Sequence, residues 1–272
     1  MGDIANSTFS RDLRVSNIHS TNPNDTQSNF TVNLNRMTET NNIVRCVFKG
    51  ASFINNSYNI HTEGEFKNNV FDYDIVGGTP GSVTITPSGF YTTSELLNII
   101  SPAIQAAAQV VEIGATVTMS SGSISKKIEA VVTGLIVGVV FPATGSLNKV
   151  LGNTMTATIT ALPAGATYVF DGTPDLYGLK RVYIHSTMMA EGNLVDGDVE
   201  THDIIGSVPV SSIVPFGGEV HYISNESELD AINYNSFRNF DSINITLRDL
   251  DNKVIELNGG PPTEIIFKMY YI

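Results

Sequence analysis

The sequence predicts an all-β protein built as a sandwich or a barrel, and three observations support this. Apolar and polar residues alternate with a period of two over many short segments, which is the pattern of a strand with one buried face. Clusters of Gly, Pro and Asn, typical of turns, separate these segments at short intervals. A single segment has the apolar spacing of a helix.

The clearest alternating segments are residues 30–35, 82–86 and 242–248. Further strands are expected over residues 43–54, 70–76, 110–119, 127–140, 155–160, 179–186, 204–210, 219–223 and 254–257. Ten or more short strands with frequent turns are typical of two packed antiparallel sheets.

The C-terminal segment, residues 264–272, is unusual because both of its faces are apolar. One face carries Ile265, Phe267, Met269 and Tyr271, and the other carries Ile266, Lys268, Tyr270 and Ile272. We expect this strand to be covered on both sides, by a second sheet or by a neighbouring subunit.

One short helix is predicted after residue 92. Thr92 and Glu95 have the spacing of a capping box, and Leu96, Ile100, Ala103 and Ala107 follow at helical intervals. Pro102 removes a backbone donor within this run, so we expect a kink or two short helices. The narrow apolar stripe indicates a helix lying against a sheet edge or end.

No linker, low-complexity tract or fixed-period repeat marks a domain boundary. Residues 1–28 are polar, rich in Asn, Ser and Thr, and weak in periodicity, which indicates an extended N-terminal arm that a partner could order. The predicted organisation is therefore an arm over residues 1–28 and one domain over residues 29–272.

The chain is acidic and poor in charge. Of its 272 residues 15% are charged and 42% are hydrophobic, and the net charge is −12. An acidic surface repels phosphate, so specific nucleic-acid binding is not expected. The longest apolar stretch, residues 131–141, is about half of a membrane span, and none is predicted. The acidic excess gathers in one segment, which we interpret as a solvated loop rather than a cation site; its members are Glu191, Asp196, Asp198, Glu200 and Asp203.

Reactive groups are scattered rather than clustered. The histidines lack the paired spacing of a metal site; they are His19, His61, His185, His202 and His221. His185 is expected on a polar strand face at the surface. Ser123–Lys126 and Ser146–Lys149 match a Ser-x-x-Lys pattern, but neither is expected to open a helix that aims both side chains together.

Two further features have simple structural explanations. Cys46 stands in an apolar run and is expected to be a small buried side chain. Asp249, Asp251 and Asn252 begin like a calcium loop, but Lys253 occupies a ligand position, so a tight hairpin turn is favoured. We therefore predict no catalytic, cofactor-binding or metal-binding residues, no cofactor, and no enzymatic activity.

The order of several segments resembles the penton, or minor capsid, proteins of virophages, Polinton-like elements and related double-stranded DNA viruses. The matching segments are residues 12–16, 28–34, 43–60, 82–97 (with Gly89-Phe90-Tyr91-Thr92 before the helix), 146–152 and 247–259. The resemblance covers nearly the whole chain as a succession of loose signatures.

This resemblance implies a single jelly-roll β-sandwich of two antiparallel sheets, assembled as a homopentamer at the icosahedral vertices of a virion. Its implied partners are the major capsid protein and other minor capsid proteins, with assembly inside the infected host cell. The acidic segment and the loops at residues 77–81 and 215–218 are candidates for outward or lateral contacts.

Three alternatives stay open. The first is a trimeric viral spike or receptor-binding jelly roll, and the second is a single-jelly-roll major capsid protein that forms its own shell. The third is an enzyme or sugar-binding domain on the same fold, which would require distant residues such as His202, Asp203 and Glu219 to meet.

Overall fold

The structure is a computed structural model, and it describes most of the chain. The described residues are 9–20, 22–34, 42–64, 66–134, 138–159, 165–176, 178–187, 203–210, 214–225 and 231–271. The chain forms two compact units. Unit 1 combines residues 1–57 with residues 179–272, and unit 2 is the continuous segment 58–178.

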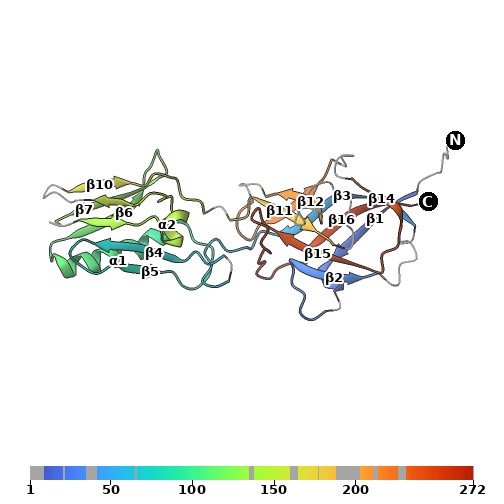
Figure 1. Ribbon diagram of the computed structural model, residues 1–272, viewed down its shortest axis with the longest axis horizontal. Helices are drawn as coiled ribbons and strands as arrows, with labels where there is room; N and C mark the ends of the chain where they lie inside the picture. The colour runs from blue at the N-terminus through green and yellow to red at the C-terminus, as the bar shows by residue number, and fades with distance from the viewer. Residues whose placement is uncertain are drawn as a thin grey trace. The chain divides into compact units, whose positions relative to one another are not determined.

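Unit 1 contains two antiparallel sheets (Figure 1). The first runs in the order β1 (Phe9–Ser16), β16 (Glu264–Tyr271), β3 (Ile43–Ile54) and then β13 (Glu219–Ile223), with β14 (Ala231–Arg238) also paired to β3. The second runs in the order β12 (Ile204–Pro209), β11 (Arg181–His185), β15 (Ser242–Arg248) and β2 (Asn29–Asn33).

The strand order of unit 1 is that of a jelly roll. Counted along the chain, with β13 and β14 sharing the sixth position beside β3, the first sheet has the order 1-8-3-6 and the second has 5-4-7-2. Each sheet thus interleaves strands from both ends of the chain, as two Greek keys wound together require. The predicted all-β fold class and its jelly-roll sandwich are confirmed.

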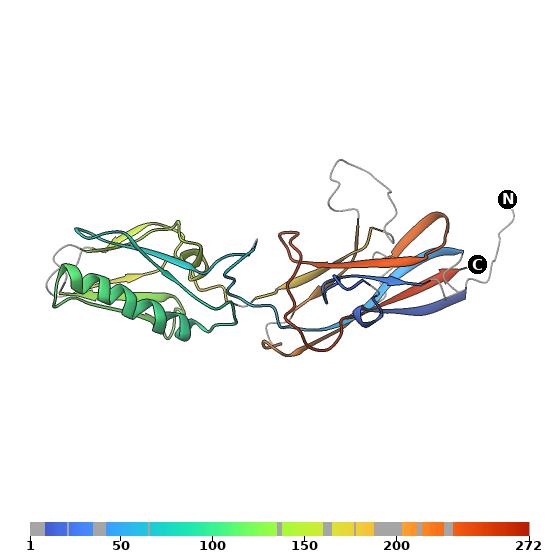
Figure 2. The same cartoon turned by 90° about the horizontal axis from the view of Figure 1, so that it is seen from below.

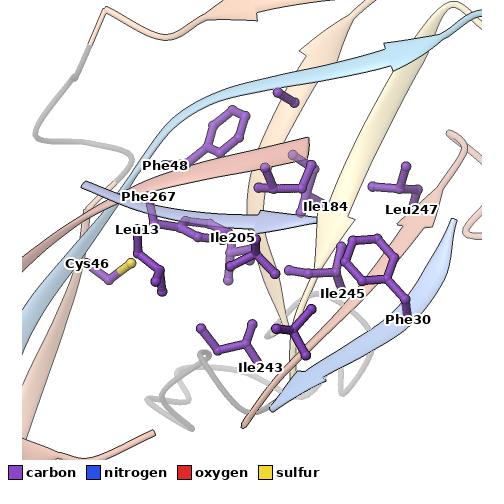
Figure 3. Packing of buried hydrophobic residues seen from close by; sticks show 14 of the residues in the cluster. Leu13, Phe30, Cys46, Phe48, Ile184, Ile205, Ile243, Ile245, Leu247 and Phe267 are labelled. Carbon is purple, nitrogen blue, oxygen red and sulfur yellow. The ribbon is translucent and has the colours of Figure 1, made fainter. Parts of the chain in front are cut away.

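The two sheets of unit 1 enclose one apolar core (Figure 3). Leu13 and Phe267 come from the first sheet, and Phe30, Ile243 and Ile245 come from the second. Their alternation along each strand directs every second side chain inward, as the sequence pattern predicts. The ring of Phe48 contacts Phe267 edge to face, with centroids 6.3 Å apart.

Unit 2 is a smaller mixed unit with two sheets and two helices. One sheet has the order β10 (Ala166–Val169), β7 (Ile128–Thr133) and β6 (Thr116–Ser121). The other has the order β5 (Gly81–Thr84), β4 (Val70–Ile75), β8 (Val139–Phe141) and β9 (Ala157–Ile159). The helices are α1 (Thr93–Val111) and α2 (Ser146–Val150), and both contribute to a core separate from that of unit 1. Ser146 thus opens a helix, contrary to the sequence expectation, and its hydroxyl accepts from the Val70 amide at 3.2 Å.

Helix α1 begins with the predicted capping box. The Glu95 backbone amide donates to the Thr92 hydroxyl, and the Glu95 carboxylate accepts from the Thr92 amide at 2.8 Å. The Thr92 amide and hydroxyl both donate to the Glu95 carboxylate, and these two hydrogen bonds lower the pKa of Glu95. The predicted break at Pro102 is wrong in one respect, because the structure contains a single helix of 19 residues rather than two. Pro102 lies on the exposed side, so the carbonyl that loses its donor can face water.

Helix α1 covers the free edge of β6 (Figure 2). The Ser101 hydroxyl donates to the Val117 carbonyl at 3.0 Å and accepts from the Met119 amide at 3.1 Å. The Gln109 side-chain amide donates to the Ala115 carbonyl at 3.3 Å. An edge strand otherwise presents unpaired backbone groups to other chains. The expected position of the helix against a sheet edge is confirmed.

We expect Ser101→Ala to destabilise unit 2 by about 1–3 kcal/mol, because it removes the partner of the Met119 amide at the covered edge. Ser94→Ala on the exposed side of α1 is the matched control and should have little effect. Hydrogen exchange measured at Met119 tests this directly. Equal protection of that amide in both variants would contradict the assigned role of Ser101.

Three strand predictions need correction. Residues 110 and 111 belong to α1, so the strand predicted over 110–119 begins only at Thr116. The strand predicted over 127–140 is two strands, β7 and β8, in different sheets, because Gly134 and Gly138 adopt positive φ angles of 74° and 109°. Residues 254–257 form only an isolated bridge between Val254 and Arg248.

The predicted domain limits, an arm over 1–28 and one domain over 29–272, differ from the observed units. The segments that connect the units, around residues 57–58 and 178–179, carry none of the Pro- or Ser-rich composition that marks a linker. Residues 9–16 are also not a separate arm within this chain. They form β1 and pair along their whole length with β16, from Phe9 opposite Tyr271 to Ser16 opposite Glu264.

The C-terminal strand is covered unequally on its two faces. Ile265, Phe267 and Met269 are buried in the core, whereas Ile266, Lys268 and Tyr270 on the opposite face are half-buried. Side chains of the neighbouring strands cover part of this opposite face. Lys49 of β3 extends across β16 to Asp12 of β1, with Nζ 2.6 Å from Oδ2. Ile272 lies outside the described residues.

Candidate functional site

The part of the chain that the structure describes contains no cluster of three or more His, Cys, Asp or Glu side chains that could hold a metal ion. His61 lies in unit 2, where its Nε2 is 2.8 Å from the Tyr58 carbonyl oxygen, and His221 lies on the exposed face of β13 in unit 1. His202 lies outside the described residues.

His185 is buried, and its predicted surface position is wrong. The register between β11 and β12 shifts between Ile184 and His185, and this bulge leaves both neighbouring side chains buried. Its Nδ1 is 2.8 Å from Oδ1 of Asp203, and the Asp203 carbonyl accepts from the Ser186 amide at 2.8 Å. The pair therefore fixes the chain just before β12.

The site considered for a possible enzyme is not assembled among the described residues. Asp203 contacts His185 beside the second sheet of unit 1. Glu219 lies on β13 in the first sheet and accepts from the Ser52 hydroxyl at 2.9 Å. Asp203 lies just before β12 of the second sheet, so the two carboxylates have separate positions and separate structural partners.

The segment after β15 is a tight turn, as predicted, and not a calcium loop. Oδ1 of Asp249 accepts from the amides of Asp251 and Lys253 at 3.0 and 2.8 Å, and the Asp249 amide donates to the Lys253 carbonyl at 2.9 Å. Asn252 has a φ of 62°, which its short polar side chain tolerates. The Asp249 carboxylate closes the turn.

Cys46 is buried in the core of unit 1, with 1% of its surface exposed, as predicted. Burial raises the pKa of its thiol strongly, because the apolar surroundings disfavour the thiolate. A thiol in this state is not a nucleophile at neutral pH.

The candidate contact segments fall on different parts of the molecule. Residues 77–81 belong to a turn in unit 2, and residues 215–218 belong to unit 1. Two hydrogen bonds connect the loop at 215–218 to Asn55, which follows β3. The Asn55 side-chain amide donates to the Val214 carbonyl at 3.1 Å, and the Gly217 amide donates to the Asn55 carbonyl at 2.8 Å. Of the acidic segment, only Asp203 lies within the described residues.

Buried asparagines form a group that the sequence patterns do not reveal. Their side-chain amides form hydrogen bonds with backbone groups, and their exposed fractions are at most 8%. The set comprises Asn55, Asn56, Asn59, Asn69, Asn148 and Asn153. These asparagines therefore serve the interior of the protein rather than its surface.

Among the described helices, none has the length and hydrophobicity that crossing a membrane demands. Asp249 stabilises a turn, Glu95 the start of a helix, and His185 the end of a strand. The main structural features of the chain are its two folded units. These features define a jelly-roll protein with an inserted second unit.

The fold of this chain is similar to that of a viral protein of known structure. The crystal structure of the selenomethionine-labelled mavirus penton protein matches with a TM-score of 0.53 and 12% sequence identity. The match covers 97% of this chain and 99% of that chain. No family model and no curated protein sequence matches this chain.

Proposed function

We propose that this chain is a viral capsid protein that forms the penton, the assembly at the five-fold vertices of an icosahedral virion. The observation that carries the proposal is the match in fold to the mavirus penton protein over nearly the full length of both chains. At 12% identity the match concerns the fold, and the order of the resembling sequence segments gives it independent support.

The role is structural rather than enzymatic. Five copies around an axis repeat one heterologous contact until the ring closes, so the protein needs two complementary surfaces and no catalytic group. The surrounding major capsid protein is the proposed partner at the vertex. Assembly takes place inside the infected host cell, and the protein is a component of the virion.

The mass of the purified protein in solution tests this proposal. Light scattering after size exclusion is expected to give about 147 kDa for five copies of 29.3 kDa. A mass of about 88 kDa indicates instead the trimeric spike or receptor-binding protein. Spontaneous formation of closed particles indicates the single-jelly-roll major capsid protein.

A reconstruction of the purified virus particle provides the second test. Density for this fold is expected at the five-fold vertices. A protein that remains monomeric at every concentration and is missing from the vertices would falsify the proposal.

A further inference from the structure

The second sheet of unit 1 has a charge opposite to that of the whole chain. Its four strands contain two arginines, Arg181 on β11 and Arg248 on β15, and no Asp or Glu, whereas the net charge of the chain is −12. In the first sheet, by contrast, Arg14 and Lys49 lie 3.6 and 2.6 Å from a carboxylate oxygen. The second sheet therefore attracts an anion that the chain as a whole repels.

Strand pairing brings both arginines beside one aromatic ring on the outward face of this sheet. Tyr183 of β11 lies directly opposite Arg248 of β15 on one side and Ser207 of β12 on the other. Arg181 precedes Tyr183 by two residues, and the buried Val182 lies between them, so both point outward. The four outward residues Arg181, Tyr183, Ser207 and Arg248 are here named the arginine row.

Both guanidinium groups of the arginine row can contact the same bound anion. Arg248 lies diagonally from Arg181 across the pair of strands β11 and β15. Residues in this relation are about 7–8 Å apart, which is within reach of two long side chains. The planar guanidinium group matches the geometry of a carboxylate or a sulfate and forms two parallel hydrogen bonds with it.

In the described part of the chain, the hydrogen-bond partners of both guanidinium groups are neutral. Nη1 of Arg181 donates to Oγ of Ser207 at 3.0 Å, and Nη1 of Arg248 donates to the Asn252 carbonyl oxygen at 2.8 Å. Nε of Arg248 is enclosed and has no hydrogen-bond partner there. These contacts orient the two groups without neutralising their charge.

Neutral polar side chains adjoin the arginine row. Thr246 stands two residues before Arg248 on the same face of β15, and its hydroxyl donates to Oδ1 of Asn29 on β2 at 3.1 Å. Hydroxyl and amide side chains are both donors and acceptors, as sugar hydroxyls are. The half-buried Tyr183 ring combines an apolar face with a polar tip and can pack against a sugar ring. The face thus suits a sugar that carries an acidic group.

We propose that the arginine row binds an acidic glycan, with its carboxylate or sulfate group between Arg181 and Arg248 and a sugar ring on Tyr183. Two arginines are too few for an extended nucleic acid, because its affinity depends on the neutralisation of many phosphates. The site lies within a single copy of the chain, so it does not depend on the proposed ring. It also shares no residue with the set considered above for a sugar-binding domain.

Binding of the full-length protein to three polymer conjugates tests this proposal. The conjugates carry lactose, 3′-sialyllactose or 3′-sulfolactose, which are neutral, carboxylated and sulfated, and multivalent display strengthens the binding of weak single sugars. At least one acidic conjugate should bind about tenfold or more tightly than the lactose conjugate. The preferred one distinguishes a carboxylate from a sulfate as the recognised group.

Variants of one exposed arginine assign the binding to the arginine row. Arg181→Ala should weaken binding of the acidic conjugate by about tenfold or more, because the charge-assisted contact is lost. Arg181→Lys retains the charge without the planar fork and should recover only part of the affinity. The matched control is Arg14→Ala, which removes an exposed arginine of the first sheet and should bind like the wild type. Thermal unfolding of each variant verifies that it is folded.

The inference is overturned if the acidic conjugates bind no better than lactose, or if Arg181→Ala and Arg14→Ala bind equally well. A polyglutamate peptide that binds as tightly as the acidic conjugates would identify an acidic peptide as the occupant, and this result also overturns the glycan assignment. The mass measurement is independent of these results. A pentamer that does not bind the conjugates leaves the proposed ring intact, and a monomer that binds them leaves the glycan site intact.

Discussion

A polypeptide of residues 58–178 is expected to fold on its own, with the secondary structure that unit 2 has in the full chain. All core residues of this unit come from within the segment, from Ile60 to Phe170. Every strand of its two sheets pairs with another strand of the same segment, and both helices lie between the same limits. Independent folding follows when core and pairing are both internal.

An amide correlation spectrum and a thermal unfolding curve of the 58–178 polypeptide measure this. Dispersed amide signals and one cooperative transition are expected. Residues 1–57 alone are the control, because they contain three jelly-roll strands whose partners β15 and β16 lie near the other end of the chain. An unfolded 58–178 polypeptide would mean that unit 2 depends on contacts with unit 1.

The jelly-roll order is complete without unit 2. Strands β3 and β11 are the third and fourth of that order, and unit 2 occupies the connection between them. An insertion at one connection leaves the pairing of all eight strand positions unchanged. The assembly surfaces of the proposed ring can therefore reside in unit 1.

Sequence patterns predicted the fold class and several strands because the signal there is local. The limits of β3 agree at both ends, since a long run rich in apolar and β-branched residues is bounded by polar segments. The capping box placed the start of α1 correctly because its two residues bond each other. In both cases the deciding contacts are close in sequence or repeat regularly.

Other features depend on distant contacts and escaped prediction. Strand β1 has Arg11 on its inward-facing side beside Leu13, so its alternation is weak, and its pairing partner β16 lies about 250 residues away. The amino-acid composition does not change at the boundaries of unit 2. The two units are distinguished by their separate cores, which form only when the chain folds.

The candidate site was only partly visible from sequence. The turn at Asp249 and the burial of Cys46 were predicted correctly, because neighbouring residues in the chain give both signals. His185 was misplaced because a bulge changes the facing of adjacent residues, and alternation alone does not reveal a bulge.

Asn148→Leu is expected to destabilise unit 2 by about 3 kcal/mol or more. Asn148 is fully buried in α2 and connects this helix to β4. Its Oδ1 accepts from the Asp72 amide at 2.8 Å, and its Nδ2 donates to the carbonyls of Asp72 and Pro142, both at 2.9 Å. Leucine has a similar volume but makes none of these bonds.

The cost arises from backbone groups that lose their partner inside the protein. In the variant the amide and carbonyl of Asp72 lose the Asn148 side chain, and each unpaired buried group costs about 1–3 kcal/mol. The Pro142 carbonyl keeps a second donor, since Nδ2 of Asn153 lies 3.2 Å away. The damage should therefore centre on β4 rather than on the Pro142 turn.

Hydrogen exchange resolved by residue separates this local effect from general unfolding. Faster exchange is expected at Asp72 and its neighbours in β4, whereas the amides of β11 and β15 in unit 1 should keep wild-type protection. Asn98→Leu, at an exposed position of α1, is the matched control and should leave both units unchanged. If Asn148→Leu and Asn98→Leu unfold at the same denaturant concentration, the buried amide does not stabilise unit 2 and its hydrogen bonds are replaceable by packing.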